Sequence, residues 1–213
     1  MILTQNTVPS GRFYIKGFAC TLEYMSAREK ILDAYERVLV EDGERAATLE
    51  AIAKAAGVSK GGLLYHFKDK RALASGLLQR LETLAEQDAV LMSQDPAGAT
   101  DYYERTSVWQ DSPLDRTIIS VTRLGNDSQA AVDTAMKRVQ DRWLSLLEGE
   151  VKDPHIARAI LLIGDGLYYN AVLSQAGERN NQEDSGKTDG RSPSSADIEG
   201  LLGAISKMVG NAA

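Results

Sequence analysis

One stretch of the sequence, residues 48–73, limits the possible fold more than any other. Thr48 has the side chain of a helix N-cap, and a short helix can follow it. Gly57 suits the left-handed backbone that ends such a helix, and Ser59 can cap a second helix that runs through His66. Two short helices joined by so tight a turn predict a helix-turn-helix within a helical domain.

The rest of the chain also favours helices. The sequence has no long alternating run of Val, Ile and Thr, and no Asn-Gly hairpin between such runs. Ser26 and Glu29 are typical of a capping box at the start of a first helix, and Asp69 can cap a long helix through Met92 or Ser93. Further helices are expected over residues 102–109, 114–124, 126–147, 154–175 and 197–209. The sequence therefore predicts an all-α fold.

The helices fall into two expected domains. Residues 26–70 form the helix-turn-helix domain and residues 71–213 a second helical domain, in which residues 177–195 contain no apolar side chain and predict a mobile loop. Residues 1–25 precede the Ser26 cap. We interpret them as a disordered extension or as an over-long gene start ahead of Met25.

Charge is distributed unevenly along the chain. The net charge of −6 alone argues against a nucleic-acid partner. However, residues 54–71 contain five Lys or Arg and one Asp, whereas residues 72–213 contain 13 Lys or Arg against 21 Asp or Glu. A basic segment on an acidic body is the pattern that DNA binding requires.

The second helix of the motif is expected to enter the major groove of double-stranded DNA. Each glycine of the pair Gly61–Gly62 costs roughly 1 kcal/mol relative to Ala in a helix, so the pair indicates close approach of the backbone to DNA. Tyr65, His66 and Lys70 supply phosphate donors, and Lys60 can reach phosphate or a guanine edge. A plain packing element and a structural histidine are the alternative interpretations.

The segment Ser59-Lys-Gly-Gly-Leu-Leu-Tyr-His-Phe-Lys-Asp-Lys70 resembles the DNA-binding domain of the TetR (tetracycline repressor) family of bacterial regulators. The resemblance covers residues 26–73 and implies an all-helical homodimer that binds a palindromic operator and carries a small-molecule inducer pocket. It implies DNA contacts by Thr48, Lys60, Gly61, Gly62, Tyr65, His66 and Lys70. Many members carry an aromatic residue at the position of Leu64, which can instead pack on a thymine methyl group.

The second domain offers candidates for ligand binding and dimerisation. Residues 154–175 are apolar nearly all round, which indicates burial on two sides, and with the last helix they can form a dimer interface. Asp165 lies among apolar neighbours and needs a partner, either Arg116 or Arg123 or a cationic ligand. The candidate ligand-binding residues are Trp109, Trp143, Asp165, Tyr168 and Tyr169, although plain core positions are the alternative.

These observations favour a cytoplasmic, ligand-responsive DNA-binding regulator, most simply a repressor released by a small apolar molecule that is cationic in one interpretation. No cofactor, metal site, catalytic residue or membrane segment is expected, because the two histidines are far apart in sequence and Cys20 is the single cysteine. An enzyme and a regulator that responds to a protein partner remain the competing classes.

Overall fold

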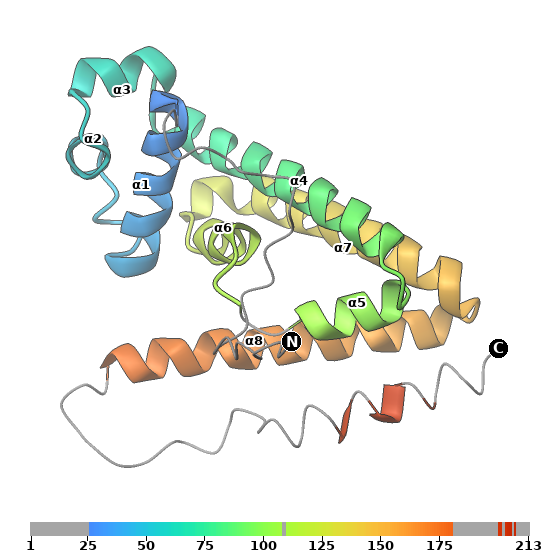
Figure 1. Ribbon diagram of the computed structural model, residues 1–213. Coiled ribbons are helices and arrows are strands. Elements are labelled where there is room, and N and C mark those ends of the chain that lie inside the picture. Colours follow the sequence, from blue (N-terminus) through green and yellow to red (C-terminus); the bar gives the residue numbers. More distant parts are fainter. Residues whose placement is uncertain (1–25, 108–109, 181–199, 202, 206, 208–213) are drawn as a thin grey trace, which may run out of the picture.

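The computed structural model describes residues 26–107, 110–180, 200–201, 203–205 and 207, and for residues 171–180 it describes the backbone alone. Its helices are, in order, α1 (Ala27–Glu41), α2 (Leu49–Ala56), α3 (Lys60–His66), α4 (Lys70–Gln94), α5 (Ala99–Thr106), α6 (Pro113–Thr122), the 3-10 helix η1 (Asn126–Ser128), α7 (Gln129–Val151) and α8 (Pro154–Asn180) (Figure 1). Residues 200–201, 203–205 and 207 are also helical. No strand occurs in the described residues, and the all-α prediction is confirmed.

Helices α1–α3 form the small N-terminal domain, at the upper left of Figure 1. Ser26 caps α1, because its Oγ accepts a hydrogen bond from the Glu29 N–H at 3.2 Å. The carboxylate of Glu29 bonds Arg80 instead of closing the predicted capping box. The fully buried side chains of this domain include Ile31, Leu32, Leu39, Ile52 and Leu63. Phe67 is 3% exposed, as predicted for a core residue.

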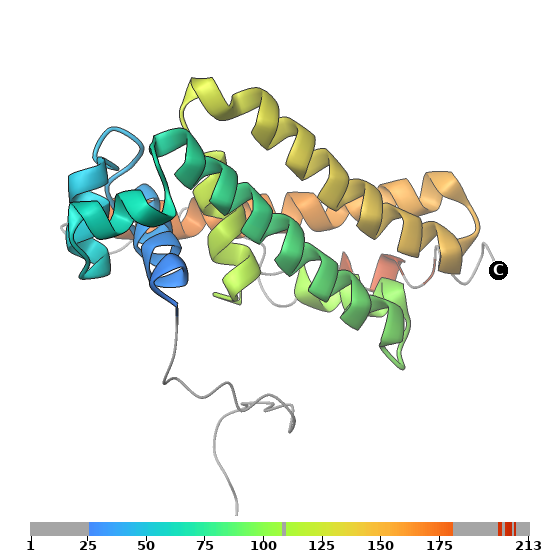
Figure 2. The same ribbon diagram turned by 90° about the horizontal axis from the view of Figure 1, so that it is seen from above.

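Helix α4 connects the two domains. It starts beside α3, contacts α1, and continues along the larger domain, where α7 lies beside it and α8 packs against α7 (Figures 1 and 2). Leu73, Leu77 and Leu81 are fully buried on one face of α4, as the leucine spacing predicts, whereas Leu91 is 48% exposed. None of the described helices is long and apolar enough to cross a membrane.

Helix α6 lies between the small domain and the rest of the large domain, in contact with both α1 and α4. Ser112 and Asp115 form a reciprocal capping box at its start, and Pro113 occupies its first position. The start of the helix is therefore set by its own N-terminal residues. This position makes α6 a neighbour of two separate cavities.

Several helix limits differ from the sequence-based expectations, and α7, for example, ends at Val151 rather than near residue 147. Helix α5 starts at Ala99 rather than near residue 102, because the Glu150 carboxylate of α7 accepts from the Thr100 N–H at 3.1 Å and so caps α5 from outside. The 3-10 helix η1 precedes α7. Helix α8 continues to Asn180, into the segment predicted as a loop, since backbone hydrogen bonds need no apolar side chain; residues 181–195 lie outside the described part.

Candidate nucleic-acid interface and ligand cavity

The turn between α2 and α3 has the predicted geometry. Thr48 Oγ1 accepts from the Ala51 N–H at 3.1 Å, and Ser59 Oγ accepts from the Gly62 N–H at 3.0 Å, so both helices are capped by the expected side chains. Gly57 has φ +68°, a left-handed conformation that side chains rarely adopt. The caps and the turn that set the start of α3 relative to α2 therefore depend on residues within the motif itself.

Helix α3 turns its two faces to different environments. Leu63 is fully buried, whereas Tyr65 is 86% exposed and Leu64 is 38% exposed. His66 is exposed, and its ring meets the Tyr65 ring edge-on at a centroid distance of 5.1 Å. An aromatic residue as exposed as Tyr65 contributes nothing to the core, so the outer face of α3 is free to contact a partner.

The fold itself does not require Gly61. Gly61 has no positive φ, and a Cβ at that position would meet only Ser59 Oγ, at 4.0 Å. At Gly62 a Cβ would lie 3.2 Å from the same oxygen, which is tight. The absence of a side chain at Gly61 therefore has no explanation within the chain.

The two lysines expected to contact DNA each meet a carboxylate of the same domain. Lys70 Nζ donates to Glu44 Oε1 at 2.6 Å and to the Glu44 backbone oxygen at 3.0 Å. Lys60 Nζ donates to the carboxylate of Glu50, which lies in the first turn of α2. Neither Glu44 nor Glu50 was identified from the sequence, because the pairs are separated by 26 and 10 positions and no helical spacing connects them.

A cavity of about 360 Å³ lies within the large domain, between α4, α5, α6, α7 and α8. Its lining includes Asp88, Asp115 and Asp165, and among the described residues that line it there is no Lys, Arg or His. Its aromatic walls are Tyr102, Tyr103, Trp143 and Tyr168. The ring centroids of Tyr103 and Trp143 lie 5.8 Å apart at a tilt of 55°. A small cavity with acidic and aromatic walls favours cations.

Asp165 has neutral partners. Gln140 Nε2 donates to Asp165 Oδ2 at 2.7 Å, and the Tyr103 hydroxyl donates to Oδ1 at 3.4 Å. The expected arginine partner is wrong: Arg116 pairs with Asp111, and Arg123 donates to the Val40 carbonyl. The partners of those two arginines thus lie in the loop before α6 and in α1. Burial raises the pKa of Asp165, an effect that its two hydrogen bonds reduce.

Asp88 is a cavity carboxylate that the sequence analysis missed. It accepts from the Tyr102 hydroxyl and from Trp143 Nε1, both at 2.8 Å. Burial raises its pKa, the two donors lower it, and the nearby Asp115 raises it further. The available signal was helical spacing, since Asp88 falls on the stripe of buried α4 positions with Leu81, Ala85 and Met92.

The remaining predicted ligand residues have mixed outcomes. Trp143 and Tyr168 line the cavity, and the Tyr168 hydroxyl donates to the Asp115 carbonyl at 3.2 Å. Tyr169 is 64% exposed and does not line it, because the next position of a helix points about 100° away. Trp109 lies outside the described residues. Gly164 lets α8 approach closely, since a Cβ there would lie 2.4 Å from the Tyr103 ring.

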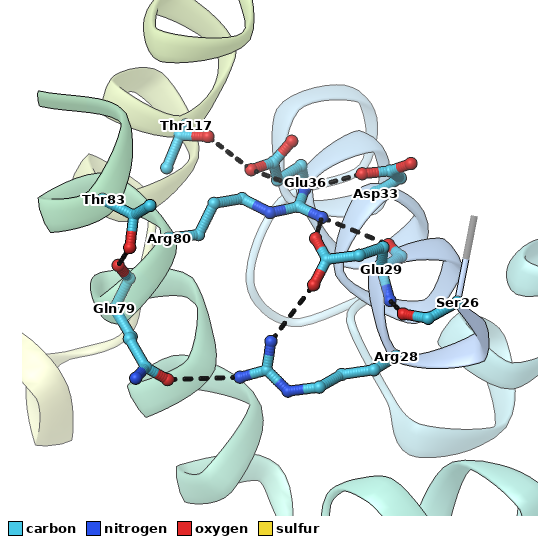
Figure 3. A network of polar contacts seen from close by, with 9 residues as sticks. All are labelled: Ser26, Arg28, Glu29, Asp33, Glu36, Gln79, Arg80, Thr83 and Thr117. Carbon is cyan, nitrogen blue, oxygen red and sulfur yellow. Dashed lines mark hydrogen bonds and ion pairs between the residues drawn. The ribbon is translucent and has the colours of Figure 1, made fainter. Parts of the chain in front are cut away.

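A second, larger cleft of about 1140 Å³ lies on the other side of α6, against α1 and α4. Arg80 of α4 is its centre: the guanidinium contacts Glu29 at 2.5 Å, Asp33 at 2.6 Å and Glu36 at 3.2 Å (Figure 3). The Thr117 hydroxyl of α6 donates to Glu36 Oε1 at 2.6 Å. Burial raises the pKa of Glu36, and Thr117 and Arg80 oppose that rise. One buried carboxylate thus connects three helices.

Comparisons with known proteins agree with this geometry. Residues 31–77 match the family described as bacterial regulatory proteins, tetR family. The regulator AcrR of Shigella flexneri is 39% identical over 61 residues, which is 29% of this chain and 28% of AcrR. The repressor Rv1474c of Mycobacterium tuberculosis is 30% identical over 88 residues, which is 38% of this chain and 47% of that protein. The matched stretch therefore spans less than half the length of these curated relatives.

The solved structures extend the likeness beyond the first domain. The multidrug-binding protein EbrR, in a crystal structure with ethidium, is 20% identical and superposes with a TM-score of 0.52 over 86% of this chain and 98% of EbrR. At that identity the likeness concerns the fold. The match to the tetR family is therefore confined to residues 31–77, and beyond them the chain shares the fold of EbrR.

Proposed function

We propose that this chain is a homodimeric repressor that binds a palindromic operator and is released by a small, mostly apolar, cationic molecule. The observation that carries the ligand response is the acidic, aromatic cavity around Asp88 and Asp165. Carboxylates that are enclosed with neutral partners remain costly, and a bound cation lowers that cost. A regulator that responds to a protein partner alone would have no need of such a cavity.

DNA binding rests on the outer face of α3. Tyr65 and His66 are exposed there and suited to phosphate, and the open space around Gly61 suits close approach of the backbone to DNA. Thr48, Lys60, Gly62 and Lys70 complete the proposed contact set. In a dimer, two such faces would enter successive major grooves about 34–36 Å apart, which is why the operator should be palindromic.

Helix α6 supplies a physical path from ligand to DNA. Leu114, Asp115 and Ile118 line the cavity on one side of α6, while Arg116 and Thr117 line the cleft on its other side. A ligand that displaces α6 therefore disturbs the Thr117–Glu36 hydrogen bond that holds α1. A ligand acts only through its different affinity for the two states, so the state with α6 displaced must bind it more tightly.

The dimer interface is proposed for α8. Leu162 is 61% exposed and Tyr169 is 64% exposed, and both are large apolar side chains seven residues apart on one helix face. Ile205, predicted as part of an interface stripe, is 2% exposed and packs with the chain's own core, and Leu202 lies outside the described residues. Changing Leu162 and Tyr169 together to Glu should therefore give a monomer in light scattering; a stable dimer would refute this interface.

Fluorescence anisotropy tests the DNA part. A palindromic duplex selected from a random library by the wild-type protein should bind more tightly than a scrambled duplex, with affinity that falls steeply with salt. Tyr65→Phe should weaken both complexes, because a phosphate contact carries little sequence information. If no palindrome is enriched, the operator-binding function is wrong.

Tryptophan quenching tests the ligand part, with ethidium as the cationic probe and a neutral phenanthridine as its matched analogue. Ethidium should quench and should release the selected palindrome, and the neutral analogue should do so at least tenfold more weakly. Asp165→Asn should remove that difference. If neither probe binds while the palindrome is still recognised, the cation-ligand proposal fails and the DNA-binding function stands.

A further inference from the structure

The pairing of Lys60 with Glu50 differs from that of Lys70 with Glu44. Lys70 and Glu44 are 39% and 37% exposed, and Lys70 also holds a backbone oxygen, so this pair ties α4 to the loop before α2. Lys60 and Glu50 are 54% and 64% exposed, with both charged groups in solvent. An ion pair so exposed adds little to folding stability, so its presence on this surface needs another explanation.

The carboxylate of Glu50 has a definite place on the proposed DNA-binding surface. Glu50 lies two residues after the Thr48 cap, in the first turn of α2, and Lys60 is the first residue of α3. The pair therefore bridges the starts of both helices of the motif. The Lys60 ammonium and the backbone N–H of Glu50 hold the pKa of this carboxyl below its usual range, so the group is ionised at neutral pH.

A negative charge at this point conflicts with phosphate binding. When Lys60 contacts phosphate, the carboxylate of Glu50 beside its ammonium also lies near the DNA backbone and repels it. In the major groove the conflict disappears, because a G·C pair presents the acceptors N7 and O6 on guanine and an amino donor on cytosine. An ammonium and a carboxylate side by side match that arrangement of acceptors and donor.

We propose that the Glu50–Lys60 pair is a specificity determinant that reads one G·C base pair, with Lys60 donating to guanine and Glu50 accepting from the cytosine amino group. The same carboxylate weakens binding to non-specific DNA, because it opposes every phosphate contact of Lys60. This inference rests on the proposed operator binding and assigns a base preference to it. Glu50 thus raises selectivity while it lowers non-specific affinity.

The test compares four full-length proteins: wild type, Glu50→Gln, Lys60→Met and the double variant. Each selects duplexes from a random library, and each is titrated by anisotropy with the wild-type palindrome and its scrambled form over a salt series. Glu148→Gln, an exposed charge change on α7, serves as the control for net charge. Circular dichroism first establishes that every variant folds.

The wild type should enrich a palindrome with one G·C pair at symmetric positions. Glu50→Gln and Lys60→Met should each lower that preference about tenfold, and the double variant should lower it no further, since the two groups read one pair. On scrambled DNA, Glu50→Gln alone should steepen the slope of log Kd against log salt by about 0.9 per protomer. Glu148→Gln should change neither quantity.

Three results would overturn the inference: an unchanged base preference in Glu50→Gln, additive losses in the double variant, or an unchanged salt slope on scrambled DNA. In each of these cases the wild-type palindrome would still be enriched, and operator binding itself would stand. Failure of the wild type to enrich any palindrome would instead refute the proposed function, and the inference with it.

Discussion

The cleft and the cavity on either side of helix α6 differ in how their carboxylates are paired. In the cleft between α1, α4 and α6, Arg80 meets three carboxylates, so the acids there have a cationic partner within the chain. In the inner cavity, Asp88 and Asp165 have hydrogen bonds from neutral groups alone among the described contacts. A buried acid with a basic partner stabilises an interface between helices, whereas one with neutral partners keeps an attraction for an external cation.

Removal of Arg80 should have the largest effect, because it leaves Glu36 buried without its cation. Arg80→Met should lower the free energy of unfolding by about 3 kcal/mol, within the range for a broken buried pair, as measured by urea denaturation. The matched control is Arg138→Met, since Arg138 is 65% exposed and pairs with Glu82 at the surface. A loss in Arg80→Met no larger than in the control would show that the cleft network is not structural.

Glu104 is a buried carboxyl that lines neither the cleft nor the cavity. Among the described contacts its Oε1 has no hydrogen-bond partner, so it shows the effect of burial on an acid that has neither a basic nor a neutral partner at that oxygen. Burial, with Asp101 and Glu150 nearby, raises its pKa from 4.5 to about 7. The folded protein therefore binds this proton more tightly than the unfolded chain does. Its contribution to stability is present below pH 4.5 and is lost as pH rises from 4.5 to 7.

Glu104→Gln removes that pH-dependent loss. The variant should be about 2 kcal/mol more stable than wild type at pH 8, as expected when a buried unsatisfied charge is removed, and little changed near pH 4. Urea denaturation at the two pH values measures the difference. Equal effects at both would mean that packing, not ionisation, explains the result.

Within the cavity, Asp165→Asn should weaken ethidium binding about tenfold, or about 1.4 kcal/mol, while the stability of the protein stays the same or rises. Because burial raises the pKa of Asp165, the wild-type affinity should begin to fall on acidification at a higher pH than for an ordinary aspartate. Quenching titrations over a pH series measure both effects. A marked loss of stability in Asp165→Asn would place this acid with Glu36 as a structural group.

The smallest expected effect concerns the hydrogen bond from Thr117 of α6 to Glu36 of α1. Thr117→Val keeps the shape of the side chain but removes the donor to Glu36, so it should cost about 1 kcal/mol and reduce the response of operator binding to ethidium. Thr122→Val is the control, because the Thr122 hydroxyl bonds its own helix at the Ile119 carbonyl. An unchanged ligand response in Thr117→Val would separate α6 from the release mechanism.

The sequence by itself determined the helix-turn-helix. The caps Thr48 and Ser59, the left-handed Gly57 and the buried Phe67 all occur as predicted, because capping and turn chemistry depend on neighbours within a few residues. The caps Ser26 and Asp69 follow for the same reason. The start of α5 instead depends on a carboxylate 50 positions away, which local patterns cannot reveal.

The tertiary structure alone decided which charges meet. The sequence suggested an arginine for Asp165, yet the fold brings Gln140 and Tyr103 to it and places Arg116 and Arg123 elsewhere. The sequence also did not reveal the partners of Glu36 and Lys60. Nor did it reveal that Asp88 lines the cavity. Electrostatic and hydrogen-bond partners are selected by distance in space, and in a helical protein that distance depends on how whole helices pack.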